Sequence, residues 1–294
     1  MTVAVAPAAA AERRLGIFAV VLAALGLSTG STLVKLAGAP GSVVAFWRLL
    51  FGAAIWIGVL TATGTGPSAA TIRRALPVGV AFGVNLAFFF TAVRATSVAN
   101  VEFIAALTPI VMVPVAAAVL HERPQWRLLA LALPAIVGVA LVVFGSGGNS
   151  TGSRRGDLLA LGAVAAWVTY LLLAKRRREG MALPELMAIV AVTAAVVVLP
   201  IGWSTGELTS LSAKGWAMCL LLAVITGTIS HGLVLWAQQR VDLGTISVIQ
   251  VSQPALAAGW AWLLLDETVT AVQALGMVVV LVSLAAFSLA SARR

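Results

Sequence analysis

Two matched apolar stretches carry residues with which this chain can bind a small molecule at membrane depth. They run from Asn100 to Glu122 and from Thr245 to Glu267, and a shift of 145 residues places Pro109 on Pro254. A proline inside a helix removes a backbone donor and frees carbonyl groups in the preceding turn. Such freed groups are tolerated where they line a cavity. The pair therefore predicts a central binding site with Pro109 and Pro254 as hinges, although a single proline can also be an ordinary kink.

Glu102 and Gln250 add polar groups to these two stretches. Glu102 is the one carboxylate well inside an apolar span, about 8 Å deep at 1.5 Å per residue. Ionisable groups at such depth are costly and usually face a cavity or a partner. Glu102 is thus a candidate for binding a substrate amine or a coupling proton. The alternative is a carboxylate that reaches back to the outer interface.

Three further apolar stretches carry candidate ligands at helical spacing, so that each set shares one helix face. They combine aromatic surface with amide and imidazole groups, which suit a small polar or aromatic substrate. Each set also has a structural explanation, because aromatic faces often only pack and a neutral histidine can bridge two helices. These candidate substrate ligands are Phe82, Asn85, Phe89, Trp167, Tyr170, His231 and Gln238.

Other notable residues are best explained by structure. Arg48 is a cation within an apolar run and must find acceptors, so we expect a structural role. The small residues from Gly26 to Gly30 suit close helix packing. Cys219 stands alone, which excludes a cysteine-based metal motif. No H-E-x-x-H motif, paired intramembrane aspartates or serine nucleophile with a base is present, so we expect no catalytic residues, no metal and no cofactor.

The composition defines an integral membrane protein. Apolar residues make up 61% of the chain and charged residues 10%, against about 25% charged in soluble domains. The net charge of +9 would indicate nucleic acid in a soluble chain. Here the basic residues lie in short loops, where they set topology. We therefore expect the lipid bilayer as a partner and no nucleic acid.

The hydropathy pattern predicts an all-α protein of ten transmembrane helices, each near the roughly 20 residues that a bilayer requires. A tail (1–14) precedes a first five-span repeat (15–145), and a linker (146–155) precedes a second repeat (156–290) and a short tail (291–294). The predicted spans are 15–36, 41–62, 74–94, 97–120, 126–145, 156–174, 183–203, 215–238, 243–265 and 270–290.

Loop charges predict the orientation of the chain. With both termini in the cytoplasm, thirteen Lys and Arg residues lie inside and five outside, which follows the positive-inside rule. Gly147 and Ser212 would then face outward. Because each repeat has an odd number of spans, the second repeat is inverted relative to the first. The simplest location is a bacterial inner (plasma) membrane.

The chain resembles the drug/metabolite transporter (DMT) superfamily, and within it the EamA-type proteins and the YddG-like amino-acid exporters. The resemblance rests on the ten inverted spans and on the endings Thr108-Pro109 to Glu122 and Gln253-Pro254 to Glu267. Arg48, Trp167 and the arginines that close spans three and eight, Arg94 and Arg240, also match. The resemblance implies a cavity walled by spans 1, 3, 4, 6, 8 and 9, with spans 5 and 10 outside as supports.

This resemblance predicts a secondary transporter that exports small metabolites, above all neutral or aromatic amino acids, by alternating access. Its partners would be a small-molecule substrate, an amino acid or a related metabolite, and we expect a monomer. Export of other metabolites or drugs stays open, as do passive, proton-coupled and potential-driven transport. A membrane-embedded enzyme and a channel are the alternatives. The missing catalytic motifs argue against the first, and the absence of repeated charge rings argues against the second.

Overall fold

The computed structural model describes residues 7–64, 66–120, 126–145, 153–177, 180–237, 240–241, 246 and 249–292, and every element in these ranges is a helix. Six helical segments in the described ranges are long and apolar enough to cross a membrane. Three shorter apolar stretches accompany them in the described ranges, namely Val98–Met112, Leu133–Phe144 and Ala271–Phe287. The structure therefore has the all-helical membrane architecture that the sequence predicts.

The first half contains seven helical segments. The apolar runs set their lengths, and Ser68 and Ser97 start two of them by accepting a hydrogen bond from a first-turn amide. The segments are α1 (Pro7–Ser28), α2 (Gly30–Leu36), α3 (Gly41–Ala62), α4 (Ala69–Ala95), α5 (Val98–Ala105), α6 (Thr108–Leu120) and α7 (Trp126–Phe144).

The second half contains seven further labelled segments. Span eight is one continuous helix. Ser212 caps its start, and its middle turns form a π-helix. The segments are α8 (Arg154–Arg177), α9 (Leu183–Trp203), α10 (Ala213–Leu221), η1 (Leu222–Ser230), α11 (His231–Ala237), α13 (Gln253–Leu265) and α14 (Ala271–Ala292).

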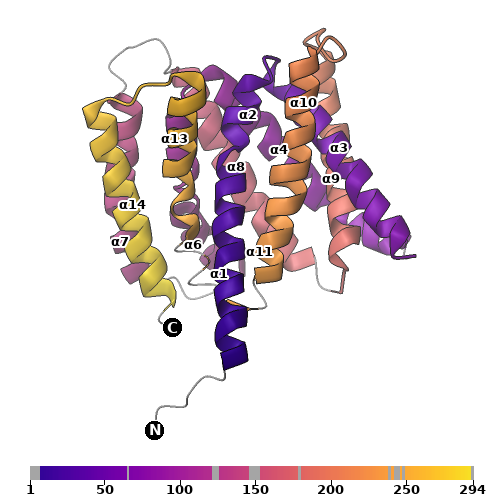
Figure 1. The fold of residues 1–294 in the computed structure, drawn as a ribbon, viewed down its shortest axis with the longest axis horizontal. Helices are drawn as coiled ribbons and strands as arrows, with labels where there is room; N and C mark the ends of the chain where they lie inside the picture. The colour runs from indigo at the N-terminus through magenta and orange to yellow at the C-terminus, as the bar shows by residue number, and fades with distance from the viewer. Residues whose placement is uncertain are drawn as a thin grey trace.

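The first helix begins earlier than the sequence pattern predicts. Residues 7–14 belong to α1, where we expected a tail up to residue 14. This stretch is rich in alanine, the residue with the highest helix propensity, so the helix extends beyond the apolar span. Figure 1 shows α1 beginning at the same end of the molecule at which α14 ends.

Both proline-bearing spans are broken at matching positions. A turn at residues 106–107 separates α5 from α6, and a turn at residues 251–252 precedes α13. Pro109 is the second residue of α6, and Pro254 is the second residue of α13. Proline is well tolerated in a first helical turn because the amide it lacks would have no intrahelical partner there. The two interruptions coincide under the 145-residue shift.

Packing between the halves follows a two-fold pattern. Helix α4 packs on α8, as α1 packs on α11 and η1, so spans three and six repeat the contact of spans eight and one. The equivalent spans of the two halves also meet directly, in the pairs α3–α9, α5–α13 and α7–α14. Exchanging the halves maps this set of contacts onto itself, as an inverted repeat requires.

The pair α7–α14 stands at one side of the molecule (Figure 1). The two helices approach closely where Gly138 faces Gly276. A Cβ atom on Gly138 would lie 2.8 Å from the Gly276 carbonyl oxygen, which is too close for any side chain. Small residues at such contacts let membrane helices pack backbone to backbone. This closely packed pair fits the supporting position expected for spans five and ten.

Candidate functional site

A cavity of about 960 Å³ lies between the two halves. Residues of spans one, three, four, six, eight and nine line it, as expected, and no described residue of α7 or α14 does. Spans two and seven also contribute, which differs from the expectation. Helix α3 supplies Arg48 and Trp56, and α9 supplies Leu183, Leu186 and Met187.

The cavity brings together most of the residues that the sequence singled out. Pro109 and Pro254 are not among its lining residues, but their neighbours Thr108 and Gln253 are. Gln238 lies outside the described residues. The predicted ligands that line the cavity are Phe82, Asn85, Phe89, Glu102, Trp167, Tyr170, His231 and Gln250.

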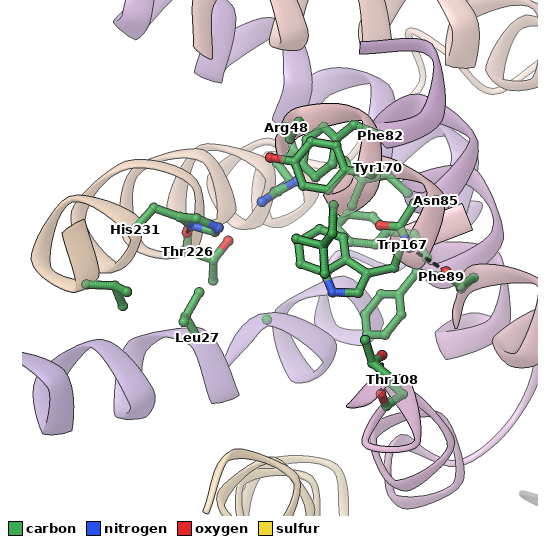
Figure 2. Close-up of a pocket in the computed structure, with 18 of the residues that line it drawn as sticks. Leu27, Arg48, Phe82, Asn85, Phe89, Thr108, Trp167, Tyr170, Thr226 and His231 are labelled. Atoms are coloured by element: carbon green, nitrogen blue, oxygen red, sulfur yellow. Dashed lines mark hydrogen bonds between the residues drawn. The ribbon is translucent and has the colours of Figure 1, made fainter. Parts of the chain in front are cut away.

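An aromatic cluster from α4 and α8 forms one wall of the cavity (Figure 2). The Trp167 and Tyr170 rings stack with centroids 4.9 Å apart, and the Phe82 ring lies 5.0 Å from that of Tyr170. Helical spacing places Trp167 and Tyr170 one turn apart on α8. Such a wall offers a large, rigid apolar surface to an aromatic or aliphatic group.

Asn85 has a structural role within this wall. Its side-chain amide donates a hydrogen bond of 2.8 Å to the Ala163 carbonyl oxygen and so ties α4 to α8 (Figure 2). Asn85 is also buried. Asn85, which we predicted as a substrate ligand, therefore uses its side-chain nitrogen for a bond to the protein backbone, and its role toward a substrate stays a prediction.

Glu102 gives the cavity a carboxylate. Its Oε1 accepts a hydrogen bond from the hydroxyl of Ser31 on α2. Both residues line the cavity. Glu102 makes no ion pair with a described basic residue. Its charge is thus available to a cationic group that enters the cavity.

Span eight presents the predicted His231 to the cavity together with Thr226, which the sequence pattern did not single out. The Nδ1 of His231, the first residue of α11, donates to the Thr226 carbonyl oxygen at 2.5 Å, and within η1 the Thr226 hydroxyl donates to the Leu222 carbonyl oxygen at 2.6 Å. The carbonyl acceptor fixes the proton on Nδ1, which leaves Nε2 of a neutral His231 as an acceptor. π-helical turns often mark functional sites. Figure 2 shows His231 and Thr226 across the cavity from Trp167.

Arg48 corrects one of our expectations. Its side chain lines the cavity, yet the residue is 8% exposed and its Nε has no hydrogen-bond partner. The Phe82 and Phe90 rings lie beside it, with their centroids 6.0 and 5.7 Å from Cζ. We expected this cation to find acceptors, and among the described residues none accepts a hydrogen bond from its Nε.

One end of the cavity is closed by contacts among helix ends. Lys35 at the end of α2 forms an ion pair with Glu267, which follows α13. The other oxygen of Glu267 accepts from the Val98 amide at 2.9 Å, and Arg94 donates to the Lys35 carbonyl oxygen at 3.1 Å. These contacts, which we call the Lys35–Glu267 closure, join spans one, three, four and nine.

The opposite end of the cavity extends toward the surface. The last turns of α8 contribute Lys175, and the first turns of α9 contribute Leu183. Helix α8 starts at the closed end, where Asp157 accepts a hydrogen bond of 2.9 Å from Thr96, so Lys175 lies near the other end. The cavity therefore reaches the end of the molecule at which α1 begins.

These features define a class of protein. Two inverted helical halves around a central cavity are the architecture of secondary transporters. The described residues hold no cluster of three or more metal-ligating side chains. A model of the EamA-like transporter family matches residues 14–144 and 154–289, and the chain belongs to this family. It is a membrane transporter and not an enzyme.

Curated exporters resemble this chain in sequence, and one solved structure shares its fold. The pseudopaline exporter CntI of Pseudomonas aeruginosa (strain UCBPP-PA14) is 24% identical over 93% of this chain and 95% of its own length. The threonine/homoserine exporter RhtA of Escherichia coli (strain K12) is 31% identical over 42% of this chain and 41% of its own. A solved structure titled "Crystal structure of protein" shares the fold, with a TM-score of 0.66 and 19% identity over 97% of this chain and 99% of that one.

Proposed function

We propose that this protein exports small metabolites, above all neutral or aromatic amino acids, across a bacterial inner membrane by alternating access. The observation that carries this proposal is the composition of the central cavity. One cavity combines an aromatic wall with a carboxylate and a guanidinium that do not pair with each other. An amino acid offers the three complementary groups, namely an apolar side chain, an ammonium and a carboxylate.

The size of the cavity supports a small substrate. Pockets for small molecules enclose roughly 300–1,000 Å³, and this cavity of about 960 Å³ lies at the upper end. An amino acid together with its hydration water fits this space. The chemistry of the cavity restricts the substrate more than its size does. A substrate has to complement the apolar wall, the carboxylate and the guanidinium at the same time.

The direction of transport is inferred from the relatives. The whole-length relative is named a pseudopaline exporter, and the relative that covers part of the chain is named a threonine/homoserine exporter. Both names specify export. With both termini in the cytoplasm, as we propose, the cavity opens inward and the Lys35–Glu267 closure seals the outer side. That state is suited to loading substrate from the cytoplasm.

A metabolite other than a free amino acid is the second candidate. The likeness to CntI covers nearly the whole chain, whereas the likeness to RhtA covers less than half. A bulkier exported metabolite would use the same aromatic wall and the same charged groups. A panel of substrates separates the two candidates.

Substrate counterflow in proteoliposomes tests the proposal. Purified protein is reconstituted, the vesicles are loaded with one unlabelled amino acid, and uptake of the labelled compound is followed. A transporter shows trans-acceleration, a channel shows flux without it, and protein-free vesicles show neither. We expect acceleration with phenylalanine, tryptophan or threonine. If no neutral amino acid is exchanged while another metabolite in the panel is, the amino-acid assignment is wrong.

A further inference from the structure

The Arg48 guanidinium is a buried cation beside the central cavity. Arg48 is the eighth residue of α3, about 10 Å from the start of that helix at 1.5 Å per residue. The residue is more than nine-tenths buried, and its side chain lines the cavity between the Phe82 ring and span eight. Figure 2 shows its nitrogen atoms directed into the space between Tyr170 and His231.

No described group neutralises this cation. No carboxylate of the described chain lies within ion-pair distance of Arg48, and its Nε has no hydrogen-bond partner. Glu102, the carboxylate in the same cavity, accepts from Ser31 instead. His231 and Thr226, which face Arg48, are already bonded to backbone carbonyl oxygens of span eight.

A cation in this position is costly unless something pairs with it. Charged groups removed from water need close partners, and within a membrane they mark substrate or ion pathways. The neighbouring rings supply only the weak attraction of aromatic faces, at 6.0 and 5.7 Å from Cζ. The protein thus holds a guanidinium in place without supplying an anion, and an anion from the cavity would complete the site.

Guanidinium chemistry selects the kind of anion. The planar fork of arginine donates two parallel hydrogen bonds to a carboxylate, and it retains its charge when buried. Phosphate also matches the fork but usually carries a second charge. The other cavity cation, Lys175, already has a partner within the protein. A single unpaired arginine therefore matches a monoanion best.

We infer that Arg48 is the subsite for the carboxylate of the transported substrate. The inference rests on the proposed function and deepens it, because it orients the substrate. The carboxylate lies on Arg48, the apolar group lies on the wall formed by Phe82, Trp167 and Tyr170, and a substrate ammonium lies toward Glu102. Each group of an amino acid then meets its complement in one cavity.

Matched acids and amides test the subsite without requiring transport. Phenylacetate and phenylacetamide share shape and ring, and only the acid carries the anion. Binding to purified protein is measured from the shift in melting temperature over a concentration series. We expect the wild type to bind the acid about 10- to 100-fold more tightly than the amide, the effect of one charge-assisted pair. Arg48→Gln should abolish this preference, whereas Arg48→Lys should keep part of it.

Arg73→Gln is the matched control, because Arg73 is an exposed arginine near the start of α4. This variant loses the same charge and should keep the full acid preference. An unchanged acid preference in Arg48→Gln overturns the inference, as does an equal loss in Arg73→Gln. A wild type that binds acid and amide equally also overturns it.

A measurement on the wild type decides the question if Arg48→Gln does not fold. Phenylglyoxal modifies accessible arginine side chains, and peptide mass spectrometry reads the modification at Arg48. We expect phenylacetate, but not phenylacetamide, to slow modification of Arg48 at least about fivefold while leaving Arg73 unaffected. Equal rates with acid and amide contradict the subsite.

The outcomes separate this inference from the proposed function. Counterflow without any acid-over-amide preference leaves the transport proposal standing and removes Arg48 from the site. Acid preference that depends on Arg48, combined with no exchange of any amino acid, keeps the carboxylate subsite and removes the amino-acid substrate.

Discussion

Glu102 shows how a single buried charge is prepared for a ligand. The Ser31 hydroxyl satisfies one lone pair of the carboxylate and leaves its negative charge uncompensated by any described cation. A hydrogen bond from a neutral donor contributes less than a salt bridge would at this depth, so a substrate ammonium or a proton can compete for the carboxylate. The residue is held in position without being neutralised.

We predict that Glu102→Gln reduces counterflow of neutral amino acids at least about tenfold, the loss of one charge-assisted contact. Glutamine has nearly the same shape, and its carbonyl oxygen can still accept from Ser31, so expression and melting temperature should hold. Counterflow over a range of external pH, together with melting curves, checks the prediction.

Glu207→Gln serves as the control, because Glu207 is an exposed carboxylate in the loop before α10. It should transport like the wild type at every pH. Wild-type flux with an unchanged pH profile in Glu102→Gln would remove the carboxylate from the substrate and proton pathway.

At the scale of elements, the interruptions of the helices give the cavity polar groups that a continuous helix would keep within its own backbone hydrogen bonds. The turns at 106–107 and 251–252 interrupt spans four and nine, and η1 widens span eight beside Arg48. Interrupted backbone is accepted at membrane depth because a cavity lies next to it. The residues that line the cavity at these breaks, Thr108 and Gln253, directly precede the two prolines.

We predict that Pro109→Ala and Pro254→Ala lower transport without lowering stability. Alanine allows the helix to continue through the break and adds at most one hydrogen bond, about 0.5–1.5 kcal/mol. A span that has to bend as access alternates becomes straighter, so counterflow should fall several-fold while the melting temperature holds or rises. Pro134→Ala in α7, away from the cavity, is the control and should leave transport unchanged.

Inverted symmetry predicts opposite effects of the two proline variants on the direction in which the cavity opens. They should bias the cavity toward opposite faces, which a cysteine replacing Trp167 in a Cys219→Ser background would report by labelling from either side. Identical labelling of both variants together with normal flux would leave Pro109 and Pro254 as ordinary kinks.

At the scale of the molecule, the two halves close one end of the cavity through a few contacts at helix ends. The Lys35 and Glu267 side chains are 17% and 11% exposed, so their ion pair is partly shielded from water. Glu267 also accepts from the Val98 amide and so connects span nine to span four. A closure made of so few contacts can separate when the two halves rock against each other, as alternating access requires.

We predict that Lys35→Ala or Glu267→Gln shifts the transporter toward the state that is open at the end which this ion pair closes. Loss of a partly buried pair worth about 1.4 kcal/mol changes the ratio of the two states about tenfold. A cysteine replacing Ala105 in the Cys219→Ser background should then react faster with an impermeant reagent on intact cells. Lys214→Ala, an exposed lysine at the same end, is the control. Equal labelling of all variants would show that the pair does not hold this end closed.

The sequence by itself determined the class of the protein, its division into two related halves and eight of the residues that line the cavity. Composition and span length depend only on residue type, and the 145-residue shift is visible in the chain. Helical spacing was enough to group Phe82 with Phe89 and Trp167 with Tyr170, because residues on one face of a helix stay together in any packing. The sequence left undecided only whether each of these helix faces lies toward the cavity.

The tertiary structure alone decided how the charged and polar groups are partnered. Helices far apart in the chain decide whether Arg48 meets an acceptor, whether the Asn85 amide bonds to Ala163 and whether Lys35 reaches Glu267. The π-helix of span eight was likewise hidden, because hydropathy does not distinguish π turns from α turns. Sequence spacing fixes which residues share a helix face, whereas the partners of a buried polar group are set by the neighbouring helices that packing brings against it.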